Sequence, residues 1–191
     1  MKAIVVGIGV IVMGALAQSA AADIYTNSYG LGIDPFITFD EFAEGDKTGT
    51  EWQPEFGVTF YGTDFRTDTS DGFPGINGLN LLGYAEPYFR IEFDVPVVRY
   101  AMAWITNPGY TTFTTYLDGV FVEEATVASN YTDPEICFAV FENMTFDAID
   151  ASIDAAFTSF RIDNLQRIEV PAPAALMPLL LGVAAARRRR N

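Results

Sequence analysis

Apolar and polar residues alternate along short stretches in the middle of the chain. Residues 88–95 alternate most strictly, and this period of two predicts a β-strand with one buried face. Residues 97–105 continue the pattern after Pro96, which predicts a second strand and a corner at the proline. The apolar face of the first stretch consists of Phe89, Ile91, Phe93 and Val95, and that of the second consists of Val98, Tyr100, Met102 and Trp104.

A tight hairpin is predicted next, because Asp118 and Gly119 separate residues 112–117 from residues 120–124. Glycine accepts the positive φ that two-residue hairpin turns require. Residues 63–82 are rich in Gly, Asp, Asn and Thr, which predicts a long loop. Further strands are predicted at residues 36–42, 57–61, 135–141, 144–149 and 157–163.

About eight short strands in about 150 residues predict an all-β domain, specifically a two-sheet antiparallel β-sandwich of the jelly-roll type. Asp147, Asp150 and Asp154 would share one face of a helix, but the residues around them favour a strand and a turn.

The N-terminal segment has the three regions of a secretory signal peptide. Lys2 precedes an apolar stretch at residues 3–17, and the small residues Ala20 to Ala22 follow it. We therefore expect residues 1–22 to form a signal helix that signal peptidase removes before Asp23. Residues 23–169 are then an exported domain.

The C-terminal segment, residues 170–191, resembles a second targeting signal. Its apolar run of about fifteen residues contains two prolines and is shorter than the roughly 20 residues that span a bilayer. The terminal arginines resist translocation, so a short hydrophobic helix here would hold the chain in a membrane. The residues that define the segment are Val170, Pro171, Ala172 and Pro173 at its start and Arg187, Arg188, Arg189 and Arg190 at its end.

The order of these parts resembles the PEP-CTERM sorting tail of exported bacterial proteins. The resemblance implies processing by an exosortase-type membrane protease, followed by display at the cell surface or release. Ala172 stands where the commonest form of the tail has Glu, so this tail is closer to the Val-Pro-Leu-Pro-Ala variant. A simple tail anchor is the alternative.

Charge and composition exclude several classes of function. The exported domain carries six basic residues and all 25 acidic residues, a formal charge of −19, which excludes nucleic acid as a natural partner. Such acidity suits divalent cations, colloidal stability or solvation. The chain has no histidine, which removes Ser-His-Asp and Cys-His catalysis. Cys137, the single cysteine, lies in an apolar run and is expected to be a buried thiol.

Residues 37–42, 56–60 and 160–165 resemble the jelly-roll ectodomains of PEP-CTERM proteins and non-catalytic carbohydrate-binding modules of that fold. The resemblance implies a calcium ion that joins the first strand to the last, with Asp40, Glu41 and Asp163 at the matching positions. The alternative is that these three residues are ordinary solvated carboxylates. Acidic residues 64, 68 and 71 lack the spacing of an EF-hand loop.

Sugar binding requires flat aromatic faces beside hydrogen-bonding groups, because a pyranose ring has an apolar face and a rim of hydroxyls. Trp104 alternates with apolar neighbours and is expected in the core. The candidate ligand-binding residues are Tyr84, Tyr88, Tyr110, Tyr116 and Asn107.

Three functions are compatible with these observations. The favoured one is a non-enzymatic protein of the cell surface or extracellular matrix, associated with exopolysaccharide through carbohydrate binding. A purely structural or adhesive envelope protein is the alternative, and a polysaccharide hydrolase is the third. Nothing distinguishes a catalytic carboxylate pair among the nominated residues Glu86, Glu92, Glu123 and Glu124.

Overall fold

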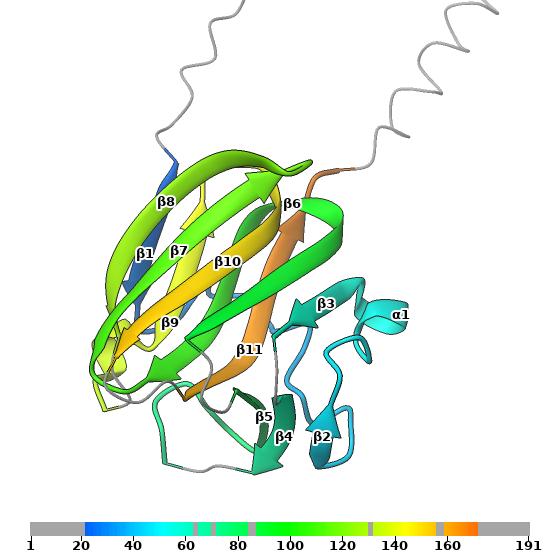
Figure 1. The fold of residues 1–191 in the computed structure, drawn as a ribbon, viewed down its shortest axis with the longest axis vertical. Coiled ribbons are helices and arrows are strands. Elements are labelled where there is room, and N and C mark those ends of the chain that lie inside the picture. The colour runs from blue at the N-terminus through cyan, green and yellow to red at the C-terminus, as the bar shows by residue number, and fades with distance from the viewer. Residues whose placement is uncertain are drawn as a thin grey trace, which may run out of the picture.

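The computed structural model describes residues 22–62, 65–69, 72–83, 87–129, 132–155 and 159–171, and these form an all-β antiparallel sandwich (Figure 1). The expected signal helix and C-terminal hydrophobic helix lie outside the described residues, apart from Ala22, Val170 and Pro171. Within the described ranges, no helix is long and apolar enough to cross a membrane.

Five strands form the front sheet in Figure 1. Its order is β3 (Val58–Tyr61), the first half of β6 (Tyr88–Thr106), β10 (Phe146–Ala155), β7 (Gly109–Leu117) and β8 (Val120–Ser129). The back sheet consists of β2 (Gly45–Lys47), β4 (Phe65–Thr69), β5 (Leu79–Gly83), β11 (Phe160–Glu169), the second half of β6, β9 (Phe138–Glu142) and β1 (Asp23–Asn27). Two short helical turns, α1 (Gln53–Phe56) and η1 (Pro134–Ile136), complete the described elements.

Strand β6 runs through both sheets. Up to Val97 it pairs with β3 and β10, and from Val97 onward it pairs with β11 and β9. The predicted corner at Pro96 is therefore present as a bend within one continuous strand (Figure 1). The bend also explains why Val95 is 46% exposed although the alternation predicted it to be buried.

Aromatic side chains fill the space between the sheets. The Trp104 ring centroid lies 5.4 Å from that of Phe89, 5.6 Å from that of Phe113 and 5.5 Å from that of Phe160. Trp104 is buried, as its sequence position predicted. Cys137 is also buried, in a second apolar cluster, and burial raises the pKa of its thiol. This second cluster consists of Ile76, Ala101, Ala103, Ile105, Cys137, Phe138 and Val140.

The hairpin prediction is confirmed in detail. Asp118 and Gly119 have φ values of 52° and 75° between β7 and β8, and two successive positive φ values match the twist of the flanking strands. The strand predicted at residues 57–61 is β3, and the one predicted at residues 144–149 begins β10. Asp147, Asp150 and Asp154 lie on a strand, not on a helix.

Two predictions at the edge of the domain are wrong. Residues 36–42 form no strand, since only Ile37 makes an isolated bridge to Leu165 and Phe39 has a φ of 62°. Residues 63–82 are not one long loop, because β4 and the start of β5 lie within them. The strand predicted at residues 135–141 begins only at Phe138, after the turn η1.

Replacing Trp104 tests the importance of the aromatic core. We expect Trp104→Ala to lower the free energy of unfolding by about 3–5 kcal/mol, because it opens a large cavity between the sheets. Chemical denaturation of the full chain measures this loss. Tyr110→Ala is the matched control, since Tyr110 is 60% exposed and should change stability by less than about 0.5 kcal/mol. Similar losses in the two variants would contradict the assignment of the core.

Candidate functional site

The outward surface of the front sheet, here named the open face, carries a cluster of tyrosines and charged side chains. Strand register places Arg90 between Tyr61 on β3 and Asp150 on β10, and Thr114 on β7 lies beyond Asp150. The neighbouring rows contain Tyr88 with Ser152 and Thr112, and Glu92 with Ala148 and Tyr116. The alternate residues of these strands, such as Phe89, Ile91, Ile149 and Phe113, are buried in the core.

Arg90 is the centre of this cluster. Its Nε donates to Glu92 Oε1 at 2.7 Å, and its Nη1 donates to Asp150 Oδ1 at 2.8 Å. The guanidinium carbon also lies 5.4 Å from the centroid of the Tyr116 ring, within the range of a cation–π contact. The side chain of Arg90 is 26% exposed and that of Asp150 is 18% exposed. One cation thus fixes two carboxylates and an aromatic ring.

Partial burial and the neighbouring carboxylates raise the pKa values of the three tyrosines of the cluster. Partial burial, together with the hydrogen bond to Asp150 and its charge, raises the pKa of Tyr88 to about 12. Partial desolvation and Asp150 likewise raise the pKa of Tyr116, and partial desolvation and Glu92 raise that of Tyr61. Tyr61 and Tyr88 remain 47% and 45% exposed. Their hydroxyls therefore stay protonated at neutral pH, and aromatic surface remains accessible.

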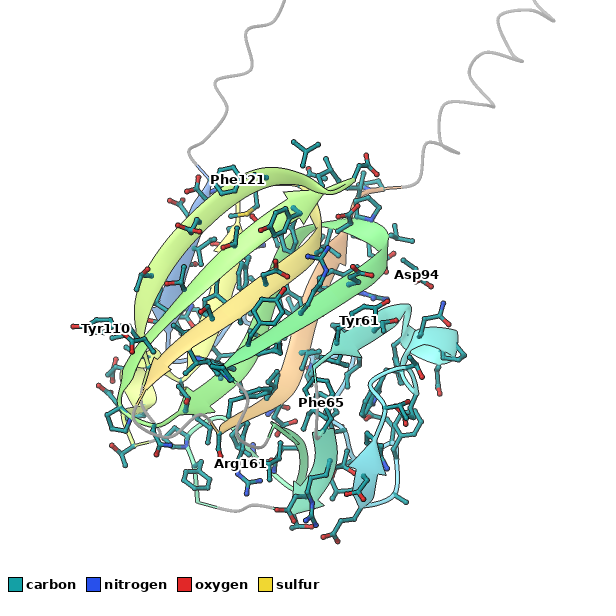
Figure 2. All side chains as sticks on the ribbon, in the orientation of Figure 1. Tyr61, Phe65, Asp94, Tyr110, Phe121 and Arg161 are labelled. Carbon is teal, nitrogen blue, oxygen red and sulfur yellow. The ribbon has the colours of Figure 1, made fainter. Side chains whose placement is uncertain are left out.

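The structure separates the predicted sugar-binding residues. Tyr88 and Tyr116 lie on the open face in the rows on either side of Asp150, whose charge raises the pKa of both. Tyr110 lies at the start of β7 opposite Asp154, and it projects on the opposite side of the view from Tyr61 (Figure 2). Tyr84 lies outside the described residues. Tyr61, Arg90 and Asp150 were not predicted to be site residues. The sequence analysis placed Tyr61 only at the end of the predicted strand at residues 57–61.

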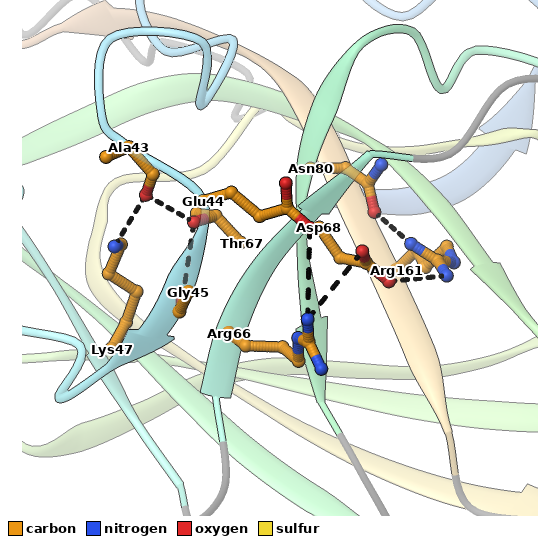
Figure 3. Close-up of polar contacts among 9 residues, drawn as sticks. All are labelled: Ala43, Glu44, Gly45, Lys47, Arg66, Thr67, Asp68, Asn80 and Arg161. Carbon is orange, nitrogen blue, oxygen red and sulfur yellow. Dashed lines mark hydrogen bonds and ion pairs between the residues drawn. The ribbon is translucent and has the colours of Figure 1, made fainter.

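Asn107 lies elsewhere, in a pocket of about 280 Å³ at the end of the sandwich where β11 begins. Arg161 lines the same pocket, and its Nη1 donates to Asn80 Oδ1 at 2.7 Å while Nη2 lies 3.5 Å from Asp68 Oδ2 (Figure 3). Asp68 also lies 3.9 Å from Arg66, so it joins β4 and β11 in an ion-pair network. The complete pocket lining is Phe73, Leu82, Ile105, Thr106, Asn107, Ser159, Phe160 and Arg161.

The predicted metal ligands occupy one region beside β11. Asp163 is buried, and its Oδ2 accepts the N–H of Asn77 at 2.8 Å while its Oδ1 accepts the N–H of Asn164 at 2.7 Å. Burial raises the pKa of Asp163 to about 7; the two N–H donors act against this increase, and the charges of Asp40 and Glu41 add to it. The three carboxylates are therefore close enough to influence one another.

Asp40 and Glu41 are themselves hydrogen-bonded to backbone groups. Asp40 Oδ1 accepts the N–H of Leu79 at 2.9 Å, and Glu41 Oε1 accepts the N–H of Thr38 at 2.9 Å. In the described part of the chain, no group of three or more His, Cys, Asp or Glu side chains is arranged to hold a metal ion. Calcium at Asp40, Glu41 and Asp163 stays a prediction.

The carboxylates nominated for hydrolysis have separate surroundings. Glu92 is paired with Arg90, whereas Glu124 Oε2 accepts the hydroxyl of Thr114 at 3.0 Å on the outer strands. The backbone carbonyl of Glu123 accepts the Thr115 hydroxyl at 3.3 Å. Glu86 lies outside the described residues.

No protein-family model matches this sequence, and no curated protein matches it significantly. Several solved structures resemble its fold at low sequence identity. TmCBM61, determined in complex with β-1,4-galactotriose, gives a TM-score of 0.37 at 11% identity and covers 68% of this chain and 100% of its own. The CBM22-1–GH10 modules of Clostridium thermocellum xylanase 10B, complexed with xylohexaose, give a TM-score of 0.37 at 13% identity. That alignment covers 73% of this chain and 28% of the xylanase chain.

A third structure is the enzymatically active domain of bacteriophage CBA120 tailspike protein 4, with a TM-score of 0.38 at 10% identity. The alignment covers 65% of this chain but only 21% of the tailspike chain. The pairing of its own strands makes the described domain an antiparallel β-sandwich. Similarity at this level concerns the fold alone and assigns no function.

The raised pKa of Asp163 predicts a specific pH dependence. Because the pKa rises from 3.8 to about 7 on folding, the folded protein binds more protons than the unfolded chain between these values. The contribution of Asp163 to stability therefore falls as the pH rises through this window and then levels off. Asp163→Asn keeps a neutral side chain at every pH, so the wild-type protein should lose stability relative to this variant from about pH 4 to about pH 7. Thermal unfolding of both proteins across this range measures the difference, and parallel profiles would contradict the assignment.

The same pair of proteins tests the calcium prediction. An ion that binds only the folded state raises its apparent stability. Calcium should therefore raise the melting temperature of the wild-type protein relative to chelator and leave that of Asp163→Asn nearly unchanged. Equal shifts in both proteins, or no shift in either, would count against a calcium site at these residues.

Proposed function

We propose that this protein is an exported, non-enzymatic surface or matrix protein whose open face binds polysaccharide. The observation that carries the proposal is the arrangement of Tyr61, Tyr88 and Tyr116 around the ion pairs of Arg90. The three rings come from three strands, and polar groups of fixed position lie between them. An oligosaccharide requires this combination, because its rings present apolar faces and its edges present hydroxyls.

The polar groups of the open face extend beyond the tyrosines. Thr112 Oγ1 lies 2.8 Å from Thr126 Oγ1, and Thr114 donates to Glu124, so hydroxyls continue across β7 to β8. Several strands therefore offer hydrogen-bonding groups in neighbouring rows. A surface that extends over several strands suits a polymer that crosses it better than a small ligand that must be surrounded.

The geometry favours binding over hydrolysis. Glycoside hydrolysis requires two carboxyl groups that face the scissile bond and exchange protons with it. On the open face, both Glu92 and Asp150 form hydrogen-bonded ion pairs with Arg90. These carboxylates therefore have a positioning role, since they hold the arginine and the tyrosine hydroxyls. A purely structural envelope protein remains the alternative function.

Removing the tyrosine rings tests polysaccharide binding. We expect Tyr88→Ala and Tyr116→Ala each to weaken binding about 5- to 100-fold, because stacking on aromatic rings contributes about 1–3 kcal/mol per ring in comparable contacts. Affinity electrophoresis of the full chain in gels that contain different polysaccharides measures the loss. Tyr29→Ala is the matched control, since Tyr29 is 66% exposed and lies after β1 of the back sheet. Equal retardation of all variants would exclude the open face as the site.

Export and sorting form the second part of the proposal. Asp23 at the start of β1 and Val170 after β11 lie at the same end of the sandwich (Figure 1). The N–H of Val170 donates to the carbonyl of Pro96 at 3.0 Å, which holds the residue after β11 at the bend of β6. A membrane-held tail would thus extend from one end of the domain and leave the open face accessible. Signal peptidase and an exosortase-type protease are the proposed processing partners.

The tail proposal predicts a defined mature protein. Ala172, Pro173 and Arg187 to Arg190 lie outside the described residues, so the test is biochemical. We expect the exported protein to begin at Asp23 and to lack the arginine cluster, and mass spectrometry of the surface fraction measures both ends. Replacing the four arginines by glutamine should block processing, because positive charge retains the tail on the cytoplasmic side. A surface protein of full C-terminal length would instead support a simple tail anchor.

A further inference from the structure

The open face is strongly acidic, and its single cation is already bound. Over β3, β6 up to Val97, β7, β8 and β10, Arg90 is the only basic residue. The acidic residues of the same face are Glu92, Asp94, Glu124, Asp150 and Asp154. Of these, only Glu92 and Asp150 are paired with Arg90.

The remaining carboxylates lie around the tyrosine cluster. Glu124 and Asp154 are exposed on β8 and β10, and Glu124 lies in the same row as Thr114 and Asp150. Asp94 is exposed at the other side, where its Oδ2 accepts the side-chain amide of Gln53 at 2.8 Å. The tyrosines are thus surrounded by negative charge. A ligand that stacks on them lies within about 10 Å of several carboxylates, a distance over which salt screens their field only partly.

We propose that the open face selects polysaccharides that carry protonated amino groups and rejects polyuronates. The inference rests on the proposed polysaccharide binding and specifies its substrate class. A protonated amine forms a charge-assisted hydrogen bond with a carboxylate, which is stronger than a bond between neutral groups. A uronate brings another negative charge to this surface, where Glu92 and Asp150 already neutralise the charge of Arg90.

Three oligosaccharides of equal length separate the possibilities. The probes are the hexamer of β-1,4-linked glucosamine, its fully N-acetylated form and a hexamer of β-1,4-linked mannuronate. The first two share one backbone and differ in charge, so their comparison isolates electrostatics. Isothermal titration calorimetry with the full chain, at a pH where the amines are protonated, measures the affinities at low and high salt.

We expect the glucosamine hexamer to bind about tenfold more tightly than the N-acetylated hexamer at low salt, and the mannuronate hexamer to bind least. The advantage should shrink as salt rises, because screening weakens exposed charge pairs. Glu124→Gln and Asp154→Asn should each lower affinity for the glucosamine hexamer about two- to fivefold. Glu135→Gln is the matched control, since Glu135 is exposed on η1, which packs beside β1 of the back sheet.

The outcomes distinguish this inference from the proposed function. Equal affinities for the amino and N-acetylated hexamers at low salt would overturn the charge selection and leave polysaccharide binding intact. Tighter binding of mannuronate would also overturn it. Failure of all three oligosaccharides to bind would overturn the binding function and, with it, the inference.

Discussion

The bend of β6 at Pro96 joins the two sheets through a single continuous strand. Before the bend, Phe89, Ile91 and Phe93 point into the sandwich while Tyr88, Arg90 and Glu92 form the open face. After the bend, Trp104 packs against Phe89 of the opposite sheet and against Phe160 of the neighbouring strand β11. Proline lacks a backbone N–H, so it suits the position where the strand exchanges one set of partners for another. Core and site are therefore placed by the same strand.

Alternation in the sequence predicted the strands that have one buried and one exposed face. It was misleading where burial or polarity had another cause. Residues 36–42 are rich in aromatic residues because they contribute to the core: the ring centroids of Phe39 and Trp52 lie 5.2 Å apart. The segment nevertheless forms no strand ladder. Conversely, β4 and β5 contain polar residues because Thr67, Asp68 and Asn80 bind partners at the edge of the domain, including Arg161. The local sequence pattern thus indicates which residues are buried, but it does not show whether a strand or another packing arrangement buries them.

The candidate site was predictable only in part. The exposed positions of Tyr88 and Tyr116 follow from alternation, but their proximity depends on the register of β6 and β7 on either side of β10. Tyr61 joins them through pairing with Arg90, a residue 29 positions away in the sequence. Asn107 and Tyr110 are near neighbours in sequence, yet one lines a pocket and the other lies on the open face opposite Asp154. Which of these residues lie close together depends on the pairing of strands that are far apart in the sequence. The alternation within one strand does not reveal that pairing.

Arg90 also determines how the acidic residues of the open face are arranged, because it pairs with Glu92 and Asp150. Without its guanidinium, Glu92 and Asp150 would lose their common partner, and the Tyr116 ring would lose its cation–π contact. With it, the rings are held before any ligand arrives, so binding requires less ordering of side chains. The same two ion pairs neutralise the guanidinium charge, and breaking them would leave two carboxylates partly buried without a partner. Preorganisation of the tyrosines and the proposed selection against anionic ligands thus depend on the same two ion pairs.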